Sequence, residues 1–231
     1  EAIEVTEPEL SAFVAGLGPD WRGLSLTMPL KRAVLAVATE SREPVPTIGV
    51  ANTLVLDRGR RVAHNTDVGG MQAALAGAGV TTVDKATVIG SGATAVAAVA
   101  ALHPIAATIV CCARSVQRAA TAVAVGERLG ARVSVVDWDH APAHLSAPVV
   151  VSTTPASSTD EWVGVVPERP GLLFDVVYEP WPTPFAAAWM DAGGAVLGGL
   201  DLLVHQAVGQ IEVMTGHRVA VPLLRRALER S

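Results

Sequence analysis

The first 80 residues carry short blocks of alternating hydrophobic and polar positions, which predict a mixture of strands and helices. The predicted strands cover residues 1–5, 23–26, 51–56 and 61–65, and the predicted helices cover residues 6–17, 29–38 and 67–77. Thr6 and Glu9 form a capping-box pattern, and Pro29 suits the first position of a helix. Asp67 is expected to cap the third helix, which ends at the glycines that follow it.

From residue 81 onward, short apolar runs alternate with helical stretches. The predicted strands cover residues 86–90, 107–112, 132–136, 148–152, 171–175 and 194–197, and two helices, 200–215 and 221–230, close the chain. This alternation is typical of a doubly wound parallel sheet. We therefore predict an α/β fold with two lobes. The first is an α/β lobe of residues 1–80 completed by the C-terminal helix 216–231, and the second is a Rossmann-like lobe of residues 81–215 that includes a bridging helix.

Composition narrows the class of protein. Hydrophobic residues make up 50% of the 231 residues and charged residues 17%, which favours a folded chain with sizeable cores. The formal net charge of −5 argues against nucleic acid as a partner. The two cysteines, Cys111 and Cys112, are too few for a disulfide framework or a zinc site, and we predict no metal.

One long stretch, residues 86–113, contains no Asp, Glu, Lys or Arg, and the mean hydropathy of the chain is +0.41. A membrane-spanning helix needs about 20 consecutive apolar residues. Here the run is interrupted at residues 90–92 and again at His103 and Pro104, which favours a buried strand, turn, helix and strand. No signal segment opens the chain, so we expect a cytoplasmic protein that does not bind membranes.

The first interruption is a candidate phosphate-binding turn. Gly90, Ser91 and Gly92 join a predicted strand to a predicted helix, as in dinucleotide-binding folds, where a pyrophosphate lies at the helix N-terminus. Ala95 stands where the third glycine of that fingerprint is expected, so a merely tight turn is the alternative.

The end of the following strand indicates which dinucleotide would bind. Folds that prefer NAD place a carboxylate there for the ribose 2′-hydroxyl. This chain instead has Arg114, with Arg118 one helical turn later, and guanidinium groups suit a 2′-phosphate. A pair of solvated arginines is the alternative, although cations are unfavourable at a helix start. The pattern predicts NADP as the cofactor.

Lys31 is the candidate for proton transfer. Only it and Lys85 are lysines among 17 basic residues, and an ammonium, unlike a guanidinium, can lose a proton at accessible pH. The first turn of a helix disfavours a cation, which suits general acid–base work. Asp67, also at a helix start, could pair with Lys31 or orient a substrate hydroxyl. A surface lysine and a helix cap are the alternatives.

Several segments, in order along the chain, resemble motifs of the shikimate dehydrogenase family. Its Asn-Val-Thr-x-Pro-x-Lys, Gly-Ala-x-Asn-Thr and Asn-Thr-Asp-x-x-Gly patterns resemble residues 25–31, 49–53 and 65–70. The glycine turn, residues 113–115 and residues 151–155 resemble its Gly-x-Gly-Gly-x, Asn-Arg-Thr and Asn-Thr-Thr-Pro segments. Residues 175–180, 183–184 and 199–207 match closely. The resemblance spans almost the whole chain.

The resemblance implies reversible, NADPH-dependent reduction of 3-dehydroshikimate to shikimate, a step of aromatic amino acid (chorismate) biosynthesis. The first lobe would be the substrate-binding domain and the second the NADP-binding domain. Lys31 and Asp67 would be the catalytic residues, with Lys31 as the acid/base. The implied substrate site consists of Thr27, Lys31, Asn52, Asp67, Tyr178 and Gln206. The implied cofactor site consists of Gly90, Ser91, Gly92, Ala93, Thr94, Arg114, Ser115, Arg118, Thr153, Val176 and Gly199.

The chain also departs from the family pattern. The family's first strand, first helix and Ser-x-Ser segment have no counterpart here, so we expect an exposed sheet edge and a change at the substrate carboxylate. Ser25, Ala113 and Leu202 stand where the family usually has Asn, Asn and Met. These changes leave two alternatives open: a sister dehydrogenase for quinate or a related hydroxy acid, and a non-catalytic NADP(H)-binding regulatory protein. Either a monomer or a homodimer fits the sequence.

Overall fold

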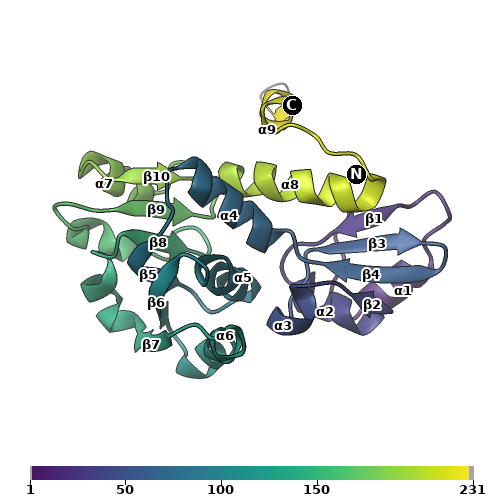
Figure 1. The fold of residues 1–231 in the computed structure, drawn as a ribbon, viewed down its shortest axis with the longest axis horizontal. Coiled ribbons are helices and arrows are strands. Elements are labelled where there is room, and N and C mark those ends of the chain that lie inside the picture. Colours follow the sequence, from purple (N-terminus) through teal and green to yellow (C-terminus); the bar gives the residue numbers. More distant parts are fainter. Residues whose placement is uncertain (1, 229–231) are drawn as a thin grey trace. The chain divides into compact units, whose positions relative to one another are not determined.

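The computed structural model describes residues 2–228, and the chain forms two compact units. Unit 1 comprises Glu1–Gly70 and Val204–Ser231, and unit 2 comprises Met71–Leu203. Each unit has its own sheet, a mixed sheet of four strands in unit 1 and a parallel sheet of six strands in unit 2 (Figure 1). The predicted α/β class, with a parallel sheet in the second lobe, is confirmed.

The sheet of unit 1 is built around a hairpin. Its strands are β1 (Gly23–Ser25), β2 (Glu40–Ser41), β3 (Thr53–Asp57) and β4 (Arg60–His64), in the order β1-β3-β4-β2. The β1–β3 and β3–β4 pairs are antiparallel, and β2 runs parallel to β4. Helices α1 (Leu10–Ala15), α2 (Leu30–Val37) and α3 (Val45–Ile48) lie in the same unit. Its core contains Leu10, Val14, Leu26, Val34, Val45, Ala51, Leu54 and Ala63.

Two predictions at the start of the chain are wrong. Residues 2–5 are not a strand, because no neighbouring strand pairs with them in the described part of the chain. The first helix begins at Leu10, although the capping-box pair forms in part: the Glu9 carboxylate accepts the Thr6 amide at 3.0 Å. The short elements β2 and α3 carry no periodic pattern and escaped prediction.

The sheet of unit 2 has the strand order of a doubly wound fold. Its six parallel strands are β5 (Val83–Ile89), β6 (Ala106–Ala113), β7 (Val133–Asp137), β8 (Val149–Ser152), β9 (Leu172–Asp175) and β10 (Ala195–Leu197). Their order is β10-β9-β8-β5-β6-β7, so the direction of chain progress reverses between β5 and β8. Ligands bind outside the carboxyl ends of the strands at such a switch point.

Both faces of this sheet are covered (Figure 1). Helices α5 (Ala93–Leu102) and α6 (Val116–Leu129) contact each other and strands β5, β6 and β7. On the other face, α7 (Pro184–Asp191) and the 3₁₀ turns η1 (Trp138–His144) and η2 (Asp160–Val165) enclose an aromatic core. Alternate residues of a strand point to opposite faces of a sheet, and Ile89 and Leu173 point to this face. Trp162, Phe185 and Trp189 pack against them. The sheet therefore carries the loops at its edge on a core that is packed on both faces.

The uncharged stretch 86–113 forms the end of β5, a turn, α5, and β6, as the interruptions in its sequence predicted. Residues 95–102 of α5 are buried all round the helix, which explains why it carries no polar face. Within residues 2–228, no helix combines the length and the apolar character needed to cross a membrane.

The unit boundaries differ from the predicted lobes. Two helices, α4 (Asp67–Gly77) and α8 (Gly199–Thr215), each contribute residues to both units. Residues 71–80 group with unit 2, and residues 204–215 group with unit 1 because Gln206 and Gln210 bond to its strands and loops. The last helix, α9 (Val221–Leu228), belongs to unit 1 and has no buried residue.

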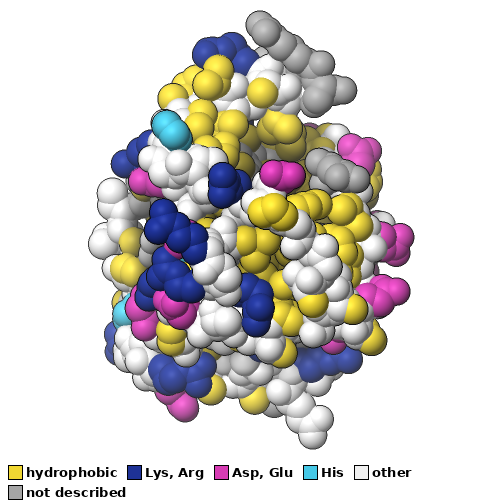
Figure 2. Space-filling model, turned by 90° about the vertical axis from the view of Figure 1, so that its right-hand side faces the viewer, with side chains coloured by type: hydrophobic (Ala, Val, Ile, Leu, Met, Phe, Trp, Pro, Cys, Tyr) yellow, Lys and Arg dark blue, Asp and Glu magenta, His cyan; other side chains and the backbone are white. Residues whose placement is uncertain are grey.

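One surface of unit 1 combines apolar and basic side chains, and Figure 2 shows the two kinds gathered next to each other. Strand β1 lies at an edge of the described sheet. Beside it is an apolar cavity of about 160 Å³ that Phe13, Trp21 and Leu24 help to line. A second cavity, of about 480 Å³, is lined by Arg22, Arg58, Arg60 and Arg61 among others.

The two cysteines provide a test of the packing in unit 2. Cys111 and Cys112 lie on β6 with no exposed surface, and burial raises the pKa of Cys111 to about 12 and that of Cys112 to about 11. Because only the thiolate reacts, we expect neither thiol of the folded protein to be alkylated by iodoacetamide at about pH 8. Intact-mass spectrometry should show two additions only after denaturation, and a native adduct would contradict this burial.

Candidate active site

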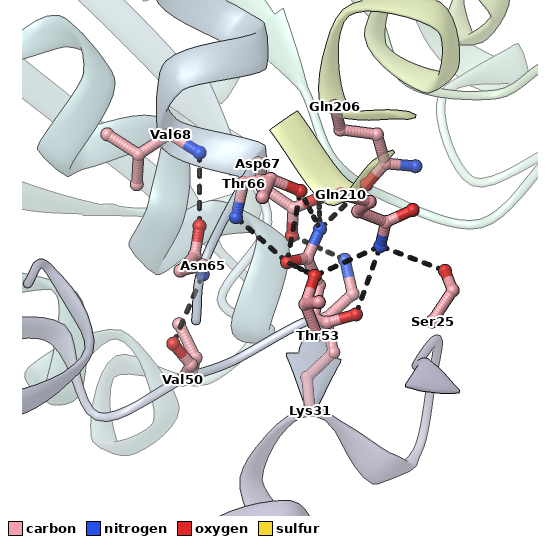
Figure 3. Close-up of polar contacts among 11 residues, drawn as sticks. Ser25, Lys31, Val50, Thr53, Asn65, Thr66, Asp67, Val68, Gln206 and Gln210 are labelled. Atoms are coloured by element: carbon pink, nitrogen blue, oxygen red, sulfur yellow. Dashed lines mark hydrogen bonds and ion pairs between the residues drawn. The ribbon is translucent and has the colours of Figure 1, made fainter. Parts of the chain in front are cut away.

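An ion pair between Lys31 and Asp67 forms the centre of a polar cluster in unit 1 (Figure 3). Lys31 Nζ lies 2.6 Å from Asp67 Oδ2, and the side chains are 12% and 1% exposed. Lys31 is the second residue of α2, and Asp67 is the first residue of α4. The sequence places these residues 36 positions apart, and the fold brings their charges into direct contact. A carboxylate this buried needs such a partner to stay charged.

Asn52, fully buried, connects the ion pair to its surroundings. Its side-chain amide donates to Asp67 Oδ1 at 2.9 Å and to Gln206 Oε1 at 2.8 Å. Its carbonyl oxygen, Oδ1, accepts the backbone N–H of Thr66 at 2.8 Å. One side chain therefore fixes the carboxylate that contacts Lys31, the start of α4 and a side chain from α8.

The predicted helix cap at Asp67 is wrong. Asn65 Oδ1 accepts the backbone N–H of Val68 at 3.1 Å, so Asn65 caps the helix instead. The amide of Asn65 also donates to the Val50 carbonyl at 3.1 Å, which ties the cap to the loop before Asn52. Because Asn65 takes this role, both oxygens of Asp67 are available to Lys31 and Asn52.

Helix α8 contributes two glutamines, of which sequence reasoning identified only Gln206. Gln210 is buried, and its amide lies 2.9 Å from Ser25 Oγ, 3.1 Å from Thr53 Oγ1 and 3.2 Å from the Asn52 carbonyl. It thereby joins β1 to β3 at the side of the polar cluster (Figure 3). Its spacing of four from Gln206 places both on one helix face, and this spacing was the available signal.

Two glycines allow α4 and α8 to approach closely at this point. A Cβ added to Gly70 would lie 2.9 Å from the backbone nitrogen of Gln206, closer than real contacts allow. A Cβ added to Gly209 would lie 3.1 Å from the Thr66 methyl group. The absence of side chains at these positions is what lets Gln206 reach Asn52.

The cluster presents groups suited to a hydroxylated ligand. Lys31 supplies a donor that can also transfer a proton, and Asp67 and Gln206 supply acceptors for hydroxyl groups. Thr27 is exposed in the loop between β1 and α2, and its carbonyl accepts the Leu30 amide at 2.8 Å. Tyr178, the remaining predicted substrate residue, belongs to unit 2, and its side chain is 54% exposed.

The predicted cofactor residues gather at the carboxyl ends of the parallel strands of unit 2. Residues 90–94 follow β5, residues 114–118 follow β6, Thr153 follows β8, and Val176 follows β9. Because parallel strands end at the same edge, these segments share the place where doubly wound folds bind ligands.

The turn after β5 fits a pyrophosphate. Gly90 has φ 119°, and a Cβ there would lie 2.3 Å from Thr153 Oγ1, so both backbone conformation and space require glycine. Thr153 closes the turn by donating to the Ile89 carbonyl at 2.8 Å. A Cβ added to Gly92, which precedes α5, would meet no atom within 4 Å. Open space at the N-terminus of a ten-residue helix accommodates an anion.

The turn after β6 fits a 2′-phosphate. Arg114 is exposed, and its guanidinium lies 4.5 Å from the ring centre of Trp138. Ser115 caps α6 by accepting the backbone N–H of Arg118 at 3.3 Å. The two cations therefore flank a helix start, and no carboxylate occupies the position that would bind a ribose 2′-hydroxyl.

The segments after β9 and β10 also meet. Gly199 donates to the Val177 carbonyl at 3.0 Å, and a Cβ on Gly199 would lie 2.3 Å from the Val176 carbonyl oxygen. Asp175, at the end of β9, is buried, and burial raises its pKa against the opposing effect of a hydrogen bond from Thr183. The Asp175 carboxyl therefore fixes the loop that follows β9 through this hydrogen bond.

Comparisons with known proteins find relatives of the whole chain. Residues 1–54 match the family described as shikimate dehydrogenase substrate binding domain. A shikimate dehydrogenase (NADP(+)) of Brucella abortus (strain S19) is 33% identical over 233 residues, covering 96% of this chain and 80% of the relative. The crystal structure of Mycobacterium tuberculosis shikimate dehydrogenase is similar with a TM-score of 0.90, at 38% identity over 97% of this chain and 86% of that one. Quinate dehydrogenase from Corynebacterium glutamicum, solved with NAD, has a TM-score of 0.84 at 27% identity, covering 95% and 82%.

The packing of α4 against α8 yields a prediction from two adjacent glycines. Gly70→Ala should lower the free energy of unfolding by about 1–3 kcal/mol, because its Cβ would press on the α8 backbone. Gly69→Ala is the matched control: its Cβ would meet nothing within 4 Å, so stability should rise by up to about 1 kcal/mol. Urea denaturation of both variants measures the difference, and equal effects would contradict the close approach.

Proposed function

This chain belongs to the shikimate dehydrogenase family, and we propose that it catalyses the reversible reduction of 3-dehydroshikimate to shikimate with NADPH. The observation that carries the proposal is the Lys31–Asp67 pair, held by Asn52 and Gln206 at 2.6–2.9 Å contacts. The pair lies in a chain that is 33% identical to an NADP(+) shikimate dehydrogenase over 96% of its length.

The proposed mechanism assigns the proton to Lys31. NADPH, when bound, supplies hydride to the carbonyl carbon of the substrate. Lys31 Nζ donates a proton to the carbonyl oxygen as negative charge develops there, and it takes the proton back in the reverse direction. Asp67 holds the ammonium in place and stabilises its charge. Asn52 keeps Asp67 oriented, and Asp67 and Gln206 would accept hydrogen bonds from hydroxyl groups of the ring.

The choice of NADP rests on residues at the carboxyl-terminal edge of the sheet of unit 2. The uncapped turn at Gly90–Gly92 is suited to the pyrophosphate, and Arg114 and Arg118 are suited to the 2′-phosphate. In this assignment, Ser91, Ala93, Thr94 and Ser115 would contact the phosphates. Thr153 would support the pyrophosphate turn, and Val176 and Gly199 would contact the nicotinamide.

A sister activity on quinate is the second candidate, and one observation favours it. Ser25 stands where the family resemblance expects Asn, and its hydroxyl lies 2.9 Å from the Gln210 amide. A smaller side chain there changes the space available to a ring substituent. The similarity to a quinate dehydrogenase, with a TM-score of 0.84, agrees with this alternative.

The decisive experiment measures NADPH formation by the purified protein. Shikimate with NADP⁺ is compared with quinate and with NAD⁺ in parallel reactions. Strong preference for shikimate and NADP⁺ supports the proposal, and turnover only with quinate or NAD⁺ supports the sister enzyme. Cofactor binding without turnover of either substrate would instead indicate a regulatory NADP(H)-binding protein.

Substitution of Lys31 tests its role in proton transfer. Lys31→Gln keeps an N–H donor for Asp67 but has no transferable proton, so kcat should fall by at least about 100-fold. NADPH affinity, measured by fluorescence, should stay within about twofold of the wild type, because the cofactor residues belong to unit 2.

The other lysine is the matched control for this experiment. Lys85 lies on β5, 3.0 Å from His144 Nδ1, and Lys85→Gln should leave kcat within about twofold. Retention of turnover by Lys31→Gln would remove Lys31 from the mechanism.

A further inference from the structure

Trp138, which the resemblance does not include, lies directly against the predicted 2′-phosphate arginine. The guanidinium carbon of Arg114 is 4.5 Å from the centre of the Trp138 ring, within the range of a cation–π contact. Arg114 also donates from Nη2 to the Ser158 carbonyl at 3.3 Å. An exposed arginine thus has two contacts that limit its conformations.

Trp138 is itself held in place from two sides. Its indole N–H donates to Glu161 Oε1 at 2.7 Å. Its ring centre lies 4.3 Å from that of Trp162, which continues the aromatic core through Phe185. Arg114 therefore stands at the end of a chain of aromatic contacts that begins in the interior of unit 2.

Several carboxylates lie in the same cavity as Arg114, so the contacts that fix the arginine matter for its position. Arg114, Trp138 and Glu161 line a cavity of about 440 Å³ together with Asp137, Asp139 and His140. Among the described residues, none of these carboxylates lies within 4.0 Å of the Arg114 guanidinium. The ring contact and the Ser158 carbonyl, rather than an ion pair, therefore set the position of the Arg114 cation.

Stacking also leaves the binding edge of the guanidinium available. The ring contact occupies the face of the planar group, and the Ser158 carbonyl takes one of its five N–H donors. The remaining in-plane donors suit the paired oxygens of a phosphate. A guanidinium fixed in advance also loses less conformational entropy when the ligand binds.

We propose that Trp138 and Glu161 are positioning residues that hold Arg114 for the 2′-phosphate of NADP and so set the preference of this chain for NADP over NAD. The inference rests on the proposed use of NADP. It adds two residues that act through Arg114 without touching the cofactor phosphate themselves.

The test uses ligands that need no turnover. Titration calorimetry of the full-length protein measures the dissociation constants of 2′,5′-ADP, which carries the 2′-phosphate, and of 5′-AMP, which lacks it. Trp138→Leu should weaken 2′,5′-ADP binding about tenfold and leave 5′-AMP within about twofold. Trp138→Phe, which retains an aromatic face, should recover most of the lost affinity, and a failure to recover would overturn the stacking role.

Substitution of Glu161 separates two possible effects on 2′,5′-ADP affinity. Loss of its positioning role should weaken binding, whereas loss of its negative charge alone should strengthen binding. Glu161→Gln keeps an acceptor for the indole N–H and should bind 2′,5′-ADP at least as tightly as the wild type. Glu161→Ala removes the acceptor and should bind it more weakly, about threefold. If both variants bind more tightly, Glu161 acts only through its charge and its positioning role is overturned.

Controls separate this proposal from the proposed function and from general damage. Trp21→Leu, in unit 1, should leave binding of both nucleotides unchanged. A wild-type protein that does not distinguish 2′,5′-ADP from 5′-AMP would overturn the choice of NADP itself. A wild type that distinguishes them, with Trp138→Leu weakening both equally or neither, would overturn only the positioning role.

Discussion

The ion pair between Lys31 and Asp67 is the constraint on which unit 1 depends. With the Asp67 side chain only 1% exposed, its charge is tolerated only while Lys31 and Asn52 both contact it. An unpaired carboxylate at that depth would destabilise the fold by about 3–5 kcal/mol. The starts of α2 and α4, the loop before β3 and the face of α8 must therefore be in place together. The same contacts therefore stabilise unit 1 and position the residues that we propose for catalysis.

The segments around the Lys31–Asp67 pair approach one another closely because two glycines stand at their contact. Gly70 and Gly209 bring the α8 backbone against α4, and this contact puts Gln206 within 2.8 Å of Asn52. Asn65 caps α4, which leaves the Asp67 oxygens for the site. None of these residues has a distinctive local sequence pattern. Their roles follow from the hydrogen-bonding groups and the space that neighbouring segments leave for them.

In unit 2, the exposed cations Arg114 and Arg118 stand at the carboxyl-terminal edge of the parallel sheet. The parallel strands end together and place the turn at Gly90 beside the segment of Arg114. The aromatic residues Trp138 and Trp162 connect that edge to the core. The position of Arg114, for which we propose binding of the 2′-phosphate, is thus supported by aromatic packing.

Most strands and helices of both units, though not the short β2 and α3, could be predicted from the sequence alone. So could the glycine turn and the candidate residues Lys31, Asp67 and Arg114, because these depend on local periodicity, conformation and residue chemistry. It misassigned residues 2–5 and the cap of α4, since strand pairing and the choice of hydrogen-bond partner are set by segments distant in sequence. The contact of Gln210 with both β1 and β3, and that of Trp138 with Arg114, became visible only in the folded chain. Such contacts produce no periodic pattern in the sequence, because they link single side chains that are far apart along the chain.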